Sequence, residues 1–179
     1  MPHQTQIKLA GLVFTLIAGT LAHFIYQWSG EKPVVGLITP VNESTWEHLK
    51  LLFFPMLVSG TVEYFFLRRQ YPNYVFTQAV GILVGMLTVV VLFYTYSGVL
   101  GFNFLAADIL TFVIGVLAGF GVSLRLLKSG SFSEPVYTAA GCLMIGALLL
   151  LFLVFTKAPP RIGLFRDPVT GEYGMSPAQ

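Results

Sequence analysis

Two glutamates and a histidine fall within six positions of one another in the segment 40–55, PVNESTWEHLKLLFFP. They are Glu43, Glu47 and His48, in a chain that has only eight acidic residues and three histidines. Imidazole and carboxylate groups hold zinc, iron or manganese in proteins, and a carboxylate is also a common general base. The segment therefore raises the hypothesis of a metal-dependent site.

The same segment also has a purely structural interpretation. Ser44 and Glu47 fit the S-x-x-E capping box, in which each side chain bonds the backbone amide of the other residue. Trp46 would then anchor the helix at the membrane interface, and Lys50 would extend its ammonium group outward to water. Under this interpretation Glu47 caps a helix and takes no part in chemistry.

The elements that must position these residues are membrane helices. Of the 179 residues, 55% are hydrophobic and 10% are charged, whereas a soluble domain carries about 25% charged residues. Five continuous apolar runs are long enough to cross a bilayer as helices, and they lie near 8–27, 49–67, 75–97, 103–126 and 136–156. We therefore predict an all-α, polytopic bundle of about five transmembrane helices over residues 1–157 and a polar C-terminal tail over 158–179.

The charges of the short loops predict an orientation. Arg68 and Arg69 follow the second run, and Arg125 and Lys128 follow the fourth. The positive-inside rule places these loops in the cytoplasm, so the N-terminus would be cytoplasmic and the tail outside the plasma membrane. Because the net charge is only +2 and the basic residues form no patch, nucleic acid is not an expected partner.

The predicted topology brings polar residues from three helices to one depth. His23 lies about 23 Å along the outward-running first helix, and Asp108 lies about 8 Å below the outer end of the fourth. His48 begins the second helix at that same end. Since ionisable groups in membrane spans are costly and tend to be functional, we predict a zinc, iron or manganese site with His23, His48 and Asp108 as ligands. Glu43 or Glu47 would be the general base.

Glu63 is expected to have a separate role. It shares a helical stripe with His48, but about 22 Å of helix separates the two residues. A structural ion pair with Arg68, Arg69 or Arg125 is one interpretation of Glu63. In the other, the stripe lines a polar path across the membrane, with a kink at the intervening proline.

Two further features concern packing. The spacings Gly81–Gly85 and Gly115–Gly119 predict close helix approach, within one bundle in preference to a dimer face. The tail, RIGLFRDPVTGEYGMSPAQ, would lie on the same side as the candidate cluster, either covering it or loosely ordered.

Several short motifs resemble those of a family of small multi-pass bacterial membrane proteins of unknown function. They are His23-Phe24, Trp28-Ser29, Val41-Asn42-Glu43-Ser44, Trp46-Glu47-His48-Leu49-Lys50, Phe54-Pro55, Asp108-Ile109 and the tail motif D-P-x-T-G-x-Y-G from Asp167. The most specific part is N-E-S-x-W-E-H, and the resemblance covers nearly the whole chain. It implies a bacterial plasma-membrane protein but no substrate, cofactor or activity.

Three functions remain open at this point. The first is a metal-dependent hydrolase of a lipid or other amphipathic substrate at the outer leaflet. The second is a proton- or cation-linked transport or binding protein that uses the same cluster and the face leading to Glu63. The third is a non-catalytic membrane subunit whose glycine faces or tail bind a partner or a second copy. The meeting of unlike ligands from separate helices favours the first slightly.

Overall fold

The computed structural model describes residues 3–175, which are mainly helical and contain no strand. The long helices are α1 (His3–Trp28), α4 (Lys50–Leu67), α5 (Tyr74–Leu100), α6 (Leu105–Ser129) and α7 (Pro135–Lys157). Three short elements lie between or after them: α2 (Pro33–Gly36), α3 (Thr45–His48), which leads into α4, and the 3-10 turn η1 (Gly163–Phe165). The all-α prediction is confirmed.

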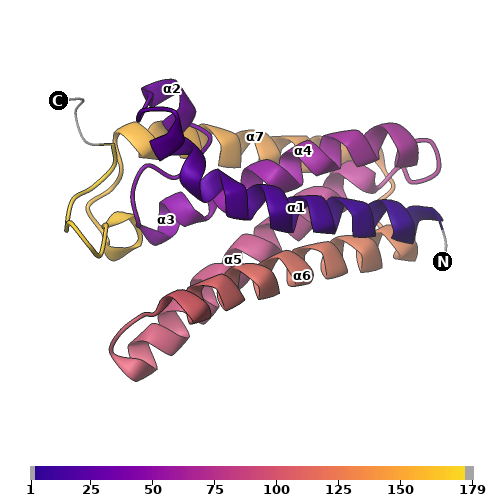
Figure 1. The fold of residues 1–179 in the computed structure, drawn as a ribbon. Coiled ribbons are helices and arrows are strands. Elements are labelled where there is room, and N and C mark those ends of the chain that lie inside the picture. The colour runs from indigo at the N-terminus through magenta and orange to yellow at the C-terminus, as the bar shows by residue number, and fades with distance from the viewer. Residues whose placement is uncertain (1–2, 176–179) are drawn as a thin grey trace.

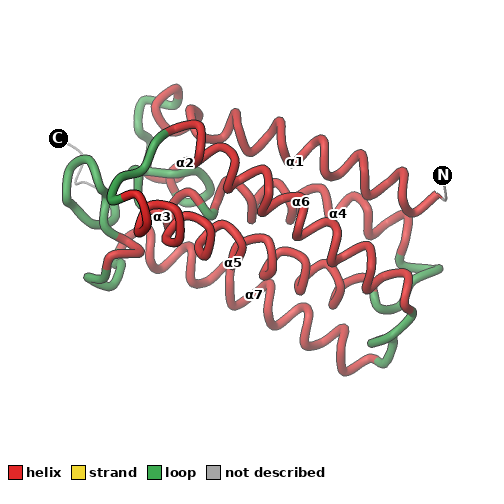
Figure 2. Tube along the Cα trace, turned by 90° about the horizontal axis from the view of Figure 1, so that it is seen from below, coloured by secondary structure: helices red, strands yellow, loops and turns green. Residues whose placement is uncertain are grey.

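The long helices run side by side, with the loops gathered at the two ends (Figures 1 and 2). α1 packs on α4, and α5 packs on both α6 and α7. The short elements α2 and α3 and the C-terminal segment lie together at one end (Figure 1). At that end the α5–α6 hairpin diverges from the other helices (Figure 1).

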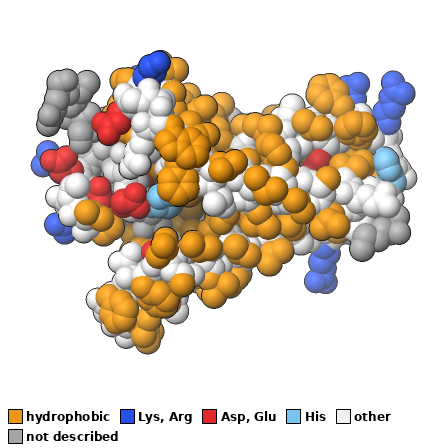
Figure 3. Space-filling model, in the orientation of Figure 1, with side chains coloured by type: hydrophobic (Ala, Val, Ile, Leu, Met, Phe, Trp, Pro, Cys, Tyr) orange, Lys and Arg blue, Asp and Glu red, His pale blue; other side chains and the backbone are white. Residues whose placement is uncertain are grey.

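Five segments of this fold are long and apolar enough to cross a membrane: 3–28, 45–67, 74–100, 105–129 and 135–157. They agree with the predicted runs, although the first helix begins five residues earlier than expected. Lys8 is therefore an internal residue of α1, with only 2% of its surface exposed. On the face shown in Figure 3, hydrophobic side chains cover much of the long middle part, and most charged ones lie towards the two ends.

The predicted glycine faces meet each other inside the chain. A Cβ added at Gly81 would lie 2.7 Å from the Gly119 carbonyl oxygen, and one added at Gly85 would lie 2.9 Å from that of Gly115. Both pairs join α5 to α6, so their backbones approach more closely than side chains would allow. The spacing serves packing within the bundle, as predicted.

Candidate functional site

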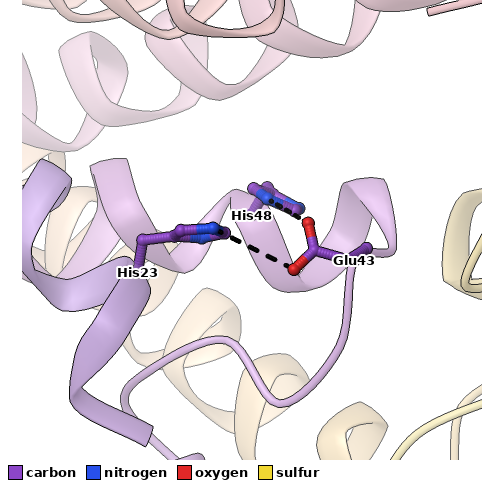
Figure 4. A group of neighbouring side chains, drawn as sticks. All are labelled: His23, Glu43 and His48. Carbon is purple, nitrogen blue, oxygen red and sulfur yellow. Dashed lines mark ion pairs between the residues drawn. The ribbon is translucent and has the colours of Figure 1, made fainter. Parts of the chain in front are cut away.

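His23, Glu43 and His48 come together at the end of the bundle that carries α2 and α3 (Figure 4). His23 projects from α1, His48 ends α3, and Glu43 lies in the loop before α3. One ligand atom from each residue can be chosen so that all three lie within 4.8 Å of one another. The Glu43 carboxylate faces both rings: Oε1 lies 4.0 Å from His23 Nε2, and Oε2 lies 3.4 Å from His48 Nε2.

The turn before α3 fixes the position of Glu43. Asn42 Oδ1 accepts a hydrogen bond from the Ser44 amide, and Asn42 Nδ2 donates to the carbonyl of Gly174 in the tail. Ser44 is the N-cap of α3, where its hydroxyl accepts from the Glu47 amide. Asn42 thus ties the loop to the C-terminal segment and holds Glu43 beside the two histidines.

A backbone hydrogen bond orients the His48 ring. Its Nδ1 lies 3.0 Å from the Ser44 carbonyl oxygen, which can only accept. Nδ1 must therefore carry the proton of this bond, and in the neutral ring the Nε2 lone pair points at Glu43. The His23 Nδ1 has no hydrogen-bond partner among the described residues, and its ring packs 5.3 Å from that of His48.

The contact between His48 Nε2 and the Glu43 carboxylate suits a shared proton or a bound cation. The neutral His48 Nε2 and the ionised Glu43 carboxylate are both acceptors, and two facing acceptors repel each other. Either a proton on Nε2 or a metal ion removes the repulsion. His23 and His48 are about one-third exposed and Glu43 about one-half, so the cluster is open to a ligand from outside.

Asp108 lies in the same pocket without joining the three-residue cluster. The pocket has a volume of about 170 Å³, and His23, Glu43, His48 and Asp108 all line it. The Asp108 carboxylate accepts hydrogen bonds from Tyr96 and Asn103, which come from α5 and the α5–α6 loop. The structure therefore brings four of the predicted site residues to one cavity.

Glu47 belongs to a different, closed arrangement. Its carboxylate is 2.6 Å from Lys50 Nζ and also accepts from the Val41 amide and the Thr156 hydroxyl. Lys50 is fully buried and donates to two backbone carbonyls as well, so the expectation that it reaches water is wrong. A charged pair with this many partners is satisfied inside the protein and needs no outward path.

Only one half of the predicted capping box forms: the Ser44 hydroxyl accepts from the Glu47 amide, but the Glu47 carboxylate does not return a bond to the Ser44 amide. The Ser44 amide bonds Asn42 and not Glu47, because the Glu47 carboxylate is held by Lys50. Trp46, expected at the membrane interface, is instead buried against Phe152 and Phe165. Phe165 belongs to the C-terminal tail, so the sequence of segment 40–55 alone could not predict that Trp46 is buried.

Glu63 lies far from this pocket and has a partner that the sequence analysis did not consider. Its Oε2 is 2.7 Å from Lys8 Nζ and accepts a 2.8 Å hydrogen bond from the Tyr74 hydroxyl. The predicted pairing with Arg68, Arg69 or Arg125 is therefore wrong. Lys8 precedes His23 by 15 residues in α1 and so shares its face of that helix.

The C-terminal tail lies at the same end of the bundle as the cluster of His23, Glu43 and His48, as predicted. Pro168 and Val169 line the pocket with Asp108, and the Met175 amide donates to the Thr156 carbonyl. Next to this pocket is a second cavity of about 840 Å³, which Glu43 and Val169 also line. The tail therefore forms part of the wall around the cluster.

The fold defines a class: a helical protein with five segments able to span a membrane and a histidine–glutamate cluster at one end. The chain belongs to a family of unknown function (DUF6512), whose model matches residues 1–175. This agrees with the resemblance drawn from its motifs. No curated protein and no solved structure matches the chain.

Proposed function

We propose that this protein is a metal-dependent membrane hydrolase in which His23, Glu43 and His48 hold one divalent ion. The observation that carries the proposal is the facing of His48 Nε2 and the Glu43 carboxylate, with His48 Nδ1 bonded to a carbonyl. A histidine that binds a metal through one nitrogen usually donates a hydrogen bond from the other.

The spacing and number of the ligands also suit a catalytic ion. Tetrahedral zinc with bonds of about 2.1 Å separates neighbouring ligand atoms by about 3.4 Å. Glu43 Oε2 lies 3.4 Å from His48 Nε2 and Glu43 Oε1 lies 4.0 Å from His23 Nε2, and one ligand atom from each residue lies within 4.8 Å of the others. Three protein ligands leave a coordination position free, as in catalytic zinc sites, and the bound ion would activate water or polarise a carbonyl group.

The proposal changes two of the roles assigned from sequence. Glu43 becomes a ligand, and Asp108, which lines the same pocket, becomes the proton acceptor. Tyr96 and Asn103 donate to its carboxylate and hold it in place. Glu47 has no catalytic role in this mechanism, because Lys50 neutralises its charge within the protein.

The pocket walls favour an amphipathic substrate. Leu51, Val89, Phe93 and Phe112 face the same cavity as the four ionisable residues. A lipid could place its apolar chain against these side chains and its scissile bond at the cluster. We place this end at the outer leaflet of a bacterial plasma membrane, with the N-terminus in the cytoplasm, because four basic residues lie at the other end. Arg68 and Arg69 follow α4 there, and Arg125 and Lys128 lie in the last turns of α6.

The first experiment is metal analysis of the protein purified in detergent without chelator. We expect about one zinc, iron or manganese ion per chain in the wild type and a loss of the ion in His23→Ala and His48→Ala. His3→Ala is the matched control, because His3 is the one remaining histidine and lies outside the cluster. Folded wild-type protein that neither contains nor takes up these ions would exclude the metal site.

A second experiment separates ligand from base. Asp108→Asn should keep the metal but lose hydrolysis of the lipid substrate found by screening, by about 10²- to 10⁴-fold in kcat. Loss of the metal in Asp108→Asn would show that Asp108 is a ligand, as first predicted from sequence, and would overturn the assignment of Asp108 as the base.

One observation favours a second function, proton-linked transport or binding. A proton on His48 Nε2 would relieve the repulsion from Glu43 as well as a metal ion would. Metal-free wild-type protein that carries a pH-dependent flux in liposomes, reduced by Glu43→Gln, would support this function. A metal-loaded protein without flux would count against it.

A further inference from the structure

The opposite end of the bundle holds a groove between α1 and α4 that the proposed hydrolase does not use. Its volume is about 380 Å³, and its wall is almost entirely apolar. α1 contributes Ala10, Gly11 and Phe14, and α4 contributes Val58, Glu63 and Phe66. Because Val58 and Phe66 are more than half exposed on spanning segments, the groove opens towards lipid.

A carboxylate oxygen without a partner borders this groove. Lys8 uses its three N–H donors on Glu63 Oε2, Gln78 Oε1 and Ser123 Oγ. Glu63 Oε2 also accepts from Tyr74, whereas Glu63 Oε1 is buried and has no hydrogen-bond partner among the described residues. An unpaired acceptor on a charged group in an apolar setting is costly, and a donor that reached it would be strongly favoured.

Glu63 Oε1 can pack at the wall of this groove because residue 11 has no side chain. A Cβ at Gly11 would collide with Glu63 Oε1, so the oxygen lies directly against the α1 backbone at a residue that lines the groove. Gly11 and Glu63 both line the groove, so this oxygen lies at its wall.

We propose that this groove binds a neutral lipid alcohol, whose hydroxyl donates to Glu63 Oε1 and whose chain lies along α1 and α4. The ligand's donor should be a neutral hydroxyl, because Lys8 already neutralises the charge of Glu63 and a second cation would add an unpaired charge. Depth is consistent with this ligand, since Glu63 is four residues, or about 6 Å, from the end of α4. That distance places the hydroxyl near the polar headgroups and the chain in the hydrocarbon layer.

The test is photolabelling of the whole protein in lipid nanodiscs. The probes are hexadecanol with a diazirine in its chain and the methyl ether of the same molecule, which cannot donate. We expect the alcohol to label the α1 and α4 peptides that line the groove about tenfold more than the ether does. Equal labelling by both probes, or labels spread over all five helices, overturns the proposal.

Groove-filling variants make the test specific. Ala10→Phe and Val58→Trp place bulk in the groove from lipid-exposed positions, so folding should be retained. Ala139→Phe, at an exposed position of α7 outside the groove, is the matched control. Labelling should fall in the first two variants and persist in the third. Undiminished labelling in a correctly folded Ala10→Phe protein contradicts the assigned groove.

Discussion

The two ends of the bundle use ionisable residues in opposite ways. At one end Lys8, Glu63 and Tyr74 are buried and joined by contacts of 2.7 to 2.8 Å. At the other, His23, Glu43 and His48 are one-third to one-half exposed and stand 3.4 to 4.0 Å apart. In the first group Lys8 pairs directly with Glu63 Oε2, whereas the second has no cationic side chain of the described residues between its members and leaves room for a cation.

The charged residues at the two ends therefore differ in role. Those around Lys8 hold helices together, whereas those of the exposed cluster are free to bind a ligand. Lys8 joins α1 to residues of α4, α5 and α6, so its ammonium group ties four helices together. Removing one member of such a pair leaves a buried charge, which costs far more than the pair itself contributes. The open cluster contributes little to stability, since its members keep water contact. Variants at the two ends should therefore fail in different assays.

The largest effect on stability is expected for Lys8→Met. The substitution keeps the length of the side chain but leaves Glu63 buried without its cation, which should lower the free energy of unfolding by about 3–5 kcal/mol. Unfolding by SDS titration in mixed micelles measures the change. The double variant Lys8→Met/Glu63→Gln should recover much of the loss, and failure to recover it would show that the charge of Glu63 is not the cause.

A smaller loss is expected for Glu47→Gln, about 2–3 kcal/mol, because Lys50 retains the carbonyl oxygens of Gly36 and Thr39 as acceptors. Glu43→Gln is the matched variant four residues away. It should leave the unfolding midpoint almost unchanged and abolish metal binding, whereas Glu47→Gln should keep the metal. If Glu47→Gln lost the metal and Glu43→Gln lost stability instead, the roles assigned to the two residues would be wrong.

Gly81→Ala tests the helix pair that both ends share. Its methyl group would lie 2.7 Å from the Gly119 carbonyl oxygen, so α5 and α6 must separate. We expect a loss of about 1–3 kcal/mol in unfolding free energy. Gly146→Ala in α7 is the control, because nothing lies within 4 Å of a Cβ there. Similar losses in the two variants would point to helix propensity and not to packing.

The smallest effect is expected for Thr156→Val, about 1 kcal/mol. The Thr156 hydroxyl lies 3.3 Å from Glu47 Oε1 and also bonds the Phe152 carbonyl within α7. Thr88→Val removes the same kind of bond to the residue four positions earlier, but the Thr88 hydroxyl makes no hydrogen bond to a carboxylate of the described residues. A thermal shift assay should therefore show a larger decrease for Thr156→Val, and equal decreases would assign no role to the contact with Glu47.

Much of the fold could be predicted because each helix is specified by its own residues. A run of about 20 apolar residues must satisfy its backbone internally in a membrane, and only a helix does so within one segment. The glycine spacings were also informative, because close approach needs small residues at fixed intervals. The depth argument worked for His23, His48 and Asp108 because rise per residue along a straight helix converts sequence position into height.

The errors came from pairings between distant segments. Lys50 and Trp46 were assigned to the interface from their own sequence neighbourhood, yet they are buried by Gly36, Thr39, Phe152 and Phe165. Glu63 was paired with Arg68, Arg69 or Arg125, which were expected near the same membrane surface, while its partner comes from α1. Helix depth can be counted from sequence, but the rotation of each helix about its axis and its neighbours cannot.

The sequence by itself determined the helical class, the five spanning segments and the presence of several ionisable residues at one depth, since these follow from local hydrophobicity and helix rise. Only the tertiary structure decided which of those residues share a pocket. It turned Glu43 towards the histidines and Glu47 towards Lys50, although the two acids are four positions apart. The physical reason is that Glu43 sits in a loop tied by Asn42 to the tail, whereas Glu47 is on a helix whose inner face meets a buried ammonium group.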